Sequence, residues 1–212
     1  MNLVNDTESN PERALALSYA PADRRAALAT LFALDARLRQ ITLAARDPTI
    51  GLMRLTWWAN ALAKLDTAPA PAEPLLRALA ADVLPRQVSG AALARLVEGW
   101  DVLLEGDVDW EEVARERGGR LFRLAAQVLG ASDPRIDTVG EAWARVDLAR
   151  GWPAAGSPDP TVLGTAYRRP WPLALRPLGA LGLLARFEAE GRTASGSPRR
   201  VARLLIHRLT GR

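Results

Sequence analysis

Apolar residues recur three and four positions apart through almost every segment between the proline and glycine breaks of this chain. This spacing places apolar side chains on one face of an α-helix, whereas strands would show alternating β-branched runs. From Pro21 to about Ala45 the apolar positions form one stripe, made of Leu28, Leu31, Phe32, Leu38 and Ile41. The pattern predicts an all-α protein.

Prolines, glycines and capping residues divide the chain into expected helices. Asn10-Pro11 and Asp47-Pro48 each combine an N-cap with a proline in the first turn. Further helices are expected over 21–45, 73–84, 89–105, 109–129, 134–150, 173–190 and 198–209, with Gly118-Gly119 as an interruption. The proline- and glycine-rich stretches 66–74 and 151–172 are predicted loops.

A chain of 212 residues with 49% hydrophobic content can bury one substantial core. We expect one helical domain over 11–212, preceded by a flexible tail over 1–10. That tail is polar and carries Asp6 and Glu8, unlike a secretory signal, and no run approaches the roughly 20 apolar residues of a spanning helix. The expectation is a cytoplasmic protein.

Composition and charge narrow the chemistry. The chain has no cysteine and His207 as its single histidine, so disulfides and thiolate sites are excluded and zinc chemistry is not expected. The net charge of +4 divides unevenly: ten arginines and two glutamates from Thr165 to Arg212 give +8, which leaves −4 for the rest. This asymmetry indicates an anionic partner surface, or an arginine-rich composition without function.

Four segments, in order, resemble the squalene/phytoene synthase family. They are YAPADRRAALATLFALDARLRQI (19–41), RLTWWANAL (54–62), GGRLFRLAAQVLG (118–130) and VGEAWARVDLARGW (139–152). Each alone is ordinary for a helix rich in Ala and Leu, and their order and spacing carry the likeness. The resemblance implies an all-α, single-domain helical bundle of the isoprenoid synthase type.

The resemblance also implies a reaction between two prenyl diphosphates that needs Mg²⁺, because diphosphate leaves only when its charge is neutralised. In the family, two aspartate clusters on facing helices hold the ions. Laid over this chain, the first cluster falls on Arg39, Gln40, Ile41, Thr42 and Leu43, and the second on Gly151 and Ala155. None of these residues is acidic. This departure resembles a branch of the family that includes mitochondrial assembly factors of respiratory complex I.

The remaining polar residues of these segments suggest a different site. An arginine can hold a phosphate through its planar fork without a metal, so Arg39, Arg54 and Arg150, with Asp147, are candidates for lining an anion-binding pocket. The alternative is that these arginines form surface or interhelix ion pairs. Asp35 is expected to pair with Arg39 one helical turn away.

Trp57 and Trp58 are both expected in the core, where tryptophans bury a large apolar area.

We therefore expect a non-catalytic assembly or binding factor, with a protein partner in the respiratory chain and no cofactor. Two alternatives stay open. One is a Mg²⁺-dependent prenyltransferase that recruits its acids from Asp35, Asp101, Asp107, Glu141 and Asp147. The other is a carrier of an isoprenoid or other lipid. Nucleic-acid binding is not expected, because the arginines lack a recognised reading motif.

The C-terminal segment predicts a basic amphipathic helix without acidic residues. Its apolar face is Val201, Leu204, Leu205 and Leu209, surrounded by Arg199, Arg200, Arg203 and Arg208. Such a helix can lie on an anionic bilayer, here as peripheral contact with the inner membrane. It can equally dock on the bundle, which a chain of this length favours because each helix is needed to complete the core.

Overall fold

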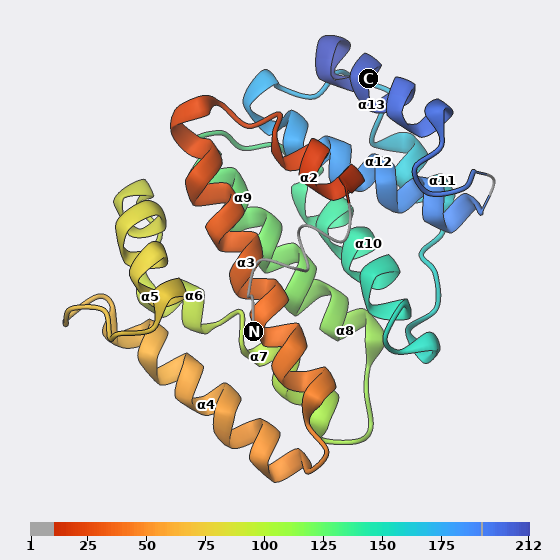
Figure 1. Ribbon diagram of the computed structural model, residues 1–212. Coiled ribbons are helices and arrows are strands. Elements are labelled where there is room, and N and C mark those ends of the chain that lie inside the picture. The colour runs from red at the N-terminus through yellow and green to blue at the C-terminus, as the bar shows by residue number, and fades with distance from the viewer. Residues whose placement is uncertain (1–10, 192) are drawn as a thin grey trace.

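The computed structural model describes residues 11–191 and 193–212, in which every regular element is a helix (Figure 1). The first half contains α2 (Pro11–Leu17), α3 (Ala22–Ala44), α4 (Pro48–Lys64), α5 (Pro74–Ala78), α6 (Gly90–Ala94) and α7 (Glu98–Asp101). The second half contains α8 (Trp110–Ala114), α9 (Arg120–Leu129), α10 (Ile136–Ala149), α11 (Pro160–Thr165), α12 (Arg176–Glu190) and α13 (Pro198–Thr210). The all-α prediction is confirmed.

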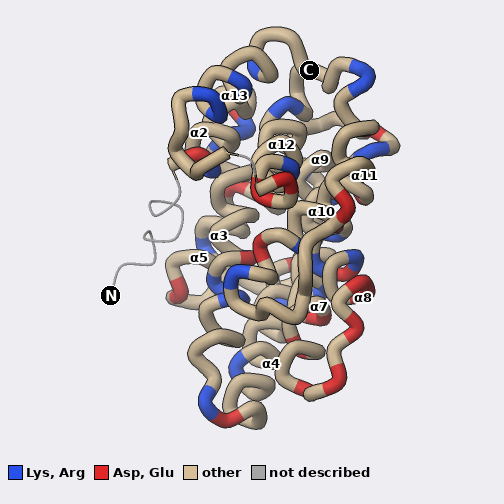
Figure 2. Tube along the Cα trace, turned by 90° about the vertical axis from the view of Figure 1, so that its right-hand side faces the viewer, with Lys and Arg blue, Asp and Glu red and all other residues tan. Residues whose placement is uncertain are grey.

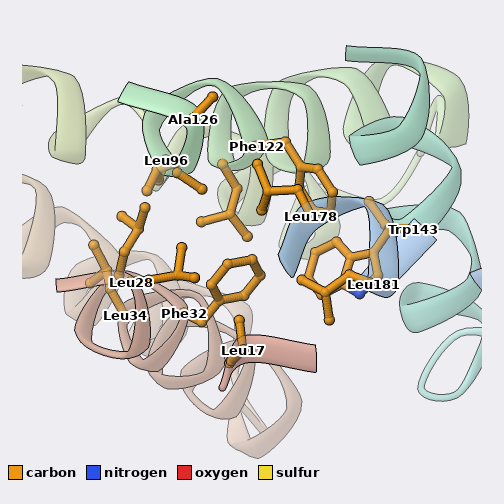
Figure 3. Packing of buried hydrophobic residues seen from close by; sticks show 14 of the residues in the cluster. Leu17, Leu28, Phe32, Leu34, Leu96, Phe122, Ala126, Trp143, Leu178 and Leu181 are labelled. Carbon is orange, nitrogen blue, oxygen red and sulfur yellow. The ribbon is translucent and has the colours of Figure 1, made fainter. Parts of the chain in front are cut away.

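Helix α3 lies at the centre because it buries more than one side. Its buried residues, Ala27, Leu28, Leu31, Phe32, Leu34, Asp35, Leu38, Ile41 and Thr42, follow each other at short helical intervals. Phe32 meets Phe122 of α9 and Trp143 of α10 edge-on, with ring centroids 6.2 and 5.7 Å apart (Figure 3). Burying each such large side chain contributes roughly 1.5–3 kcal/mol. The aromatic contacts therefore fix α9 and α10 against α3.

In the described part of the structure, the side chains of several N-cap residues accept hydrogen bonds from the first turns of their helices. The Asp47 carboxylate accepts from the backbone N–H of Thr49 at 2.8 Å, and Pro48 occupies the first helical position of α4. Glu73, Ser89 and Asp109 cap α5, α6 and α8 in the same manner. The predicted cap at Asn10 and the tail over 1–10 lie outside the described residues.

Three expected boundaries differ from the structure. The helix expected over 89–105 is divided into α6, α7 and a 3₁₀ turn at Val102–Leu104, and 151–172 contains α11, which Asp159 caps and Leu163 anchors in the core. Gly118-Gly119 does not end the helix over 109–129. It belongs to a π-helical turn, Arg115–Gly119, that joins α8 to α9 without a break.

This π-helical turn packs backbone against backbone on α10. A Cβ atom placed on Gly118 would lie 2.2 Å from the Gly140 carbonyl oxygen, and one on Gly140 would lie 2.4 Å from that of Gly118. On the opposite side, a Cβ on Gly99 of α7 would lie 2.9 Å from the backbone nitrogen of Arg117. Only glycine permits such approach. The turn is thereby held between α7 and α10, with Arg117 in the interior.

The C-terminal helix docks on the bundle through Leu204 and His207, both 0% exposed. The His207 Nε2–H donates to the Arg176 carbonyl of α12 at 3.2 Å. Arg200 is also buried, at 2% exposure, so its assignment to the membrane-facing surface was wrong: it lies one turn before Leu204 on the docked face. Arg199 and Arg208 are exposed and Arg203 is half-buried.

The burial of His207 predicts that acid weakens the fold. Burial, with Arg176 and Arg203 nearby, lowers the pKa of His207 from 6.5 to about 4 against two backbone hydrogen bonds that raise it. The unfolded chain therefore binds the proton first. The contribution of neutral His207 to the free energy of unfolding is complete above pH 6.5. It is lost as the pH falls from 6.5 to 4, by a total on the order of 3 kcal/mol.

Urea unfolding of the wild type and of His207→Gln across this pH range measures the effect. The glutamine keeps a donor for the Arg176 carbonyl but does not titrate. Asp101 acts in the opposite direction, because burial with Glu105 and Glu98 raises its pKa to about 6. The informative quantity is thus the difference between the two proteins, and equal pH slopes would contradict the prediction.

Candidate functional site

A buried arginine joins two buried aspartates at the centre of the bundle. Arg117 is 1% exposed and donates through Nε and Nη2 to the two carboxylate oxygens of Asp35, at 2.9 and 2.8 Å. The same Nη2 donates to Asp147 Oδ2 at 2.6 Å. Paired, bidentate contacts of this kind are among the strongest ion pairs in proteins. They connect α3, the π-helical turn and α10.

Aromatic rings complete the surroundings of this guanidinium. Its central carbon lies 4.3 Å from the ring centroid of Trp100 on α7 and 5.0 Å from that of Trp143 on α10. Burial opposes the charge of Arg117, but Asp35 and Asp147 outweigh it and raise the pKa of Arg117 above its ordinary value. Arg117 therefore stays charged in an apolar interior, stabilised by two carboxylates and two ring faces.

Asp147 lies among four guanidinium groups. Besides Arg117, the Nε of Arg39 lies 3.7 Å from Asp147 Oδ2, and Nη1 of Arg150 lies 3.9 Å from Oδ1. Arg13 of α2 acts on the same carboxylate through its charge. Burial would raise the pKa of Asp147, but Arg117 and Arg13 outweigh burial and lower it to about 2. Asp147 is thus ionised throughout the physiological range.

The cavity beside this cluster is small. It has a volume of about 30 Å³ and lies between α2, α10 and α12, where Arg13, Trp143, Asp147, Arg150 and Glu188 are among its lining residues. A volume of this size holds about one water molecule. Burial lowers the pKa of Arg13, whose guanidinium carbon lies 5.3 Å from the Phe32 ring centroid. The interior is therefore filled by charged and aromatic side chains.

Further ion pairs lead from the residues around Asp147 to the helices α2 and α13. Arg150 Nη2 lies 3.8 Å from Glu188 Oε1 of α12, and Arg200 of α13 donates to the same oxygen at 2.6 Å. Arg200 Nη1 also lies 3.3 Å from Glu12 Oε2 of α2. Positive and negative groups alternate along this path, which links α2, α10, α12 and α13.

The structure brings part of the sequence-predicted site together. Arg39 and Arg150 both approach Asp147, as described above. Arg54 does not join them: it is exposed on α4, because that helix turns Leu55 and Trp58 inward and position 54 lies on another face. The expected Asp35–Arg39 pair is corrected as well, since Asp35 binds Arg117 while Arg39 turns toward Asp147.

The positions that the family resemblance assigns to the two aspartate clusters do face each other. A Cβ atom on Gly151 would lie 3.4 Å from Nη2 of Arg39 and 3.2 Å from the Leu43 side chain. An arginine, a leucine and a glycine thus meet where the resemblance implies carboxylates.

The structure changes the expected position of one tryptophan, Trp57. Trp58 is 3% exposed, as expected for the core, but Trp57 is 49% exposed and contacts Trp58 edge-on at 5.5 Å between centroids.

Arg117 was not identified as a site residue from the sequence. Its signal was its position: with Val113, Ala114, Leu121 and Phe122 it continues the buried face of the helical segment over 109–129. An arginine in such a stripe needs buried partners.

Removing the buried arginine tests the importance of this cluster. Arg117→Met leaves the buried Asp35 carboxylate unpaired and removes the nearest partner of Asp147, so we expect a loss of about 3–5 kcal/mol of unfolding free energy in urea. Adding Asp35→Asn removes the unpaired charge and should restore much of this loss, while Asp147 keeps Arg39 and Arg150 beside it.

The matched control is Arg123→Met, which breaks an exposed pair with Asp137 that spans 3.4 Å. Exposed pairs of this kind contribute less than about 1 kcal/mol. Similar losses for Arg117→Met and Arg123→Met, or no recovery in the double variant Arg117→Met with Asp35→Asn, would contradict the central role of Arg117.

Comparison with known proteins agrees with the geometry. The sequence model for squalene/phytoene synthase matches residues 7–156 of this chain, which is well over half of its length. No curated protein and no solved structure matches it. The matched part contains α3, α10, the Arg39–Gly151 juxtaposition and the Asp35–Arg117–Asp147 cluster. The chain belongs to the squalene/phytoene synthase family.

Proposed function

We propose that this chain is a non-catalytic member of the squalene/phytoene synthase family that acts as a binding or assembly factor. The observation that carries the proposal is the occupation of Asp35 and Asp147 by Arg117 at 2.6–2.9 Å. The assembly of a respiratory-chain complex is the role that the resemblance implies. Its partner would bind to the surface and not to the interior.

Magnesium, which the family implies, does not fit the residues of this interior. Mg²⁺ takes carboxylate oxygens in a strict octahedral arrangement and keeps several waters. Asp35 and Asp147 do converge, but on an arginine, and the further guanidinium groups around Asp147 repel a cation. Among residues 11–191 and 193–212, no group of three or more His, Asp or Glu side chains is placed to hold a metal ion.

The small volume of the cavity beside Asp147 also favours a binding role over prenyl transfer or lipid carriage. Sites for small organic ligands usually have volumes of roughly 300–1,000 Å³. The cavity beside Asp147 has about 30 Å³. Trp100 and Trp143 fill the space around Arg117 that an apolar ligand would need.

The outer face of α4 supplies a surface for a protein partner. Ile50, Met53 and Trp57 lie on one stripe of this helix and are 49%, 68% and 49% exposed. The stripe leads into a groove of about 400 Å³ whose lining includes Trp57, Leu65, Pro69 and Pro71. Exposed apolar residues aligned with a groove are typical of protein interaction sites.

Charge around this stripe indicates what kind of partner fits. Helix α4 carries Arg54 and Lys64 and has no acidic residue within Pro48–Lys64. An amphipathic helix that places apolar side chains on the stripe and acidic residues at its flanks would complement both features.

Incubation with farnesyl diphosphate and Mg²⁺ tests the absence of catalysis. We expect no diphosphate release above that of buffer, and no magnesium binding in calorimetry. Release that is lost in a folded Asp147→Asn variant would overturn the proposal, because it would show that the buried carboxylate acts in catalysis.

Complementation separates an assembly role from an enzymatic one. In cells lacking this chain, we expect less assembled respiratory complex I on native gels and lower NADH:quinone reductase activity. The double variant Arg117→Met with Asp35→Asn should restore both if it is folded.

By contrast, Ile50→Asp with Met53→Asp should weaken partner binding at least about tenfold and fail to restore assembly. The matched control is Val162→Asp, which changes an exposed apolar residue of α11. Equal restoration by the α4 variant and the control would contradict the assigned surface, and unaltered complex I in the deletion cells would contradict the respiratory role.

A further inference from the structure

Helix α13 has two apolar faces, and only one of them contacts the bundle. Leu204 and His207 point inward and are 0% exposed. Leu205, Ile206 and Leu209 are 44%, 46% and 77% exposed. At about 100° per residue, Leu205 and Leu209 lie on the side opposite His207, and Ile206 lies on the side opposite Leu204. A helix that only completed the core would carry polar residues there.

A second segment extends this outward apolar ridge. Leu173, just before α12, is 71% exposed. Arg176 connects its surroundings to the end of α13, because its Nη1 donates to the carbonyls of Arg208 and Leu209 at 2.5 and 3.2 Å. The Trp171 N–H also donates to the Gly211 carbonyl at 2.8 Å. The ridge of Leu173, Leu205, Ile206 and Leu209 is therefore held on a rigid support.

Arginines flank this ridge, and acids are missing from its helix. Arg199, Arg208 and Arg212 are exposed on α13 and at its end, and Arg168 and Arg169 are exposed in the segment that leads to Trp171. No Asp or Glu occurs within Pro198–Thr210. Figure 2 shows basic residues along α13, whereas acidic residues gather along α8. The surface is apolar at its centre and cationic at its borders.

We propose that the ridge of α13 and Leu173 binds the surface of an anionic lipid bilayer. The apolar side chains enter the boundary between headgroups and acyl chains, and the arginines on both flanks contact the lipid phosphates. None of the helices in the described parts of the chain is long and apolar enough to cross a bilayer, so the contact is a peripheral one.

The geometry favours a bilayer over a protein segment for this surface. The ridge and its arginines come from α13 and the segment before α12, and α13 lies at an outer end of the molecule, opposite α4 (Figures 1 and 2). A projecting ridge bordered by one sign of charge complements an apolar layer beneath anionic headgroups. The α4 stripe differs, because it leads into a groove. The two surfaces lie at opposite ends, so bilayer and protein partner can be bound together.

Flotation of the purified full chain with vesicles tests this proposal. Vesicles of phosphatidylcholine with phosphatidylglycerol should bind the chain at low salt and release most of it at high salt, and vesicles of phosphatidylcholine alone should bind about tenfold less. Ile206→Ser with Leu209→Ser should reduce binding about tenfold. Arg199→Gln with Arg212→Gln should reduce binding and make the remainder less sensitive to salt.

Matched controls are Val162→Ser for the apolar change and Arg77→Gln with Arg95→Gln for the charge change. These residues are exposed elsewhere on the molecule, and the control variants should bind like the wild type. All substituted positions are exposed, so circular dichroism should show unchanged folding.

Failure to bind anionic vesicles at low salt would overturn the proposal. So would binding that the ridge variants leave intact, or a change of oligomeric state in those variants without vesicle binding, which would identify the ridge as an interface between chains. None of these outcomes bears on the assembly role, which rests on the α4 surface and on complementation.

Discussion

The pairing of Arg117 with Asp35 and Asp147 is the constraint on which the interior depends. A buried charge is tolerated only when opposite charges and hydrogen bonds surround it. Here two carboxylates from α3 and α10 bind one guanidinium from a π-helical turn. The turn reaches this depth because Gly118 and Gly140 let two backbones approach closely. Backbone packing and charge pairing therefore require each other.

In this arrangement arginines surround the two carboxylates at the centre of the bundle. Asp35 and Asp147 are paired with arginines, and the rings of Trp100 and Trp143 lie against the Arg117 guanidinium. A network that extends through Glu188 and Arg200 to Glu12 ties the first and last described helices to the centre. These internal ion pairs hold the helices together, and the cavity beside Asp147 has a volume of about 30 Å³.

On the surface, apolar residues remain exposed at the two ends of the molecule, on α4 and on α13. The stripe on α4 leads into a groove, and the ridge on α13 projects between arginines. Their different shapes suit different partners, a protein segment for the groove and a lipid surface for the ridge. A rigid bundle holding both would place a protein partner at a fixed distance from the membrane.

The sequence by itself determined the helical class, most helix boundaries, the capping at Asp47 and the absence of acids at Arg39 and Gly151, because periodicity and local hydrogen bonding act within a few residues. Tertiary structure decided the partners of Asp35, the inward turn of Arg200 and the exposure of Trp57. These depend on which face of each helix meets its neighbours, and a helix with two apolar faces leaves that choice open. Arg117 pairs with residues 82 and 30 positions away in the chain, a distance at which only the packed fold brings charges together.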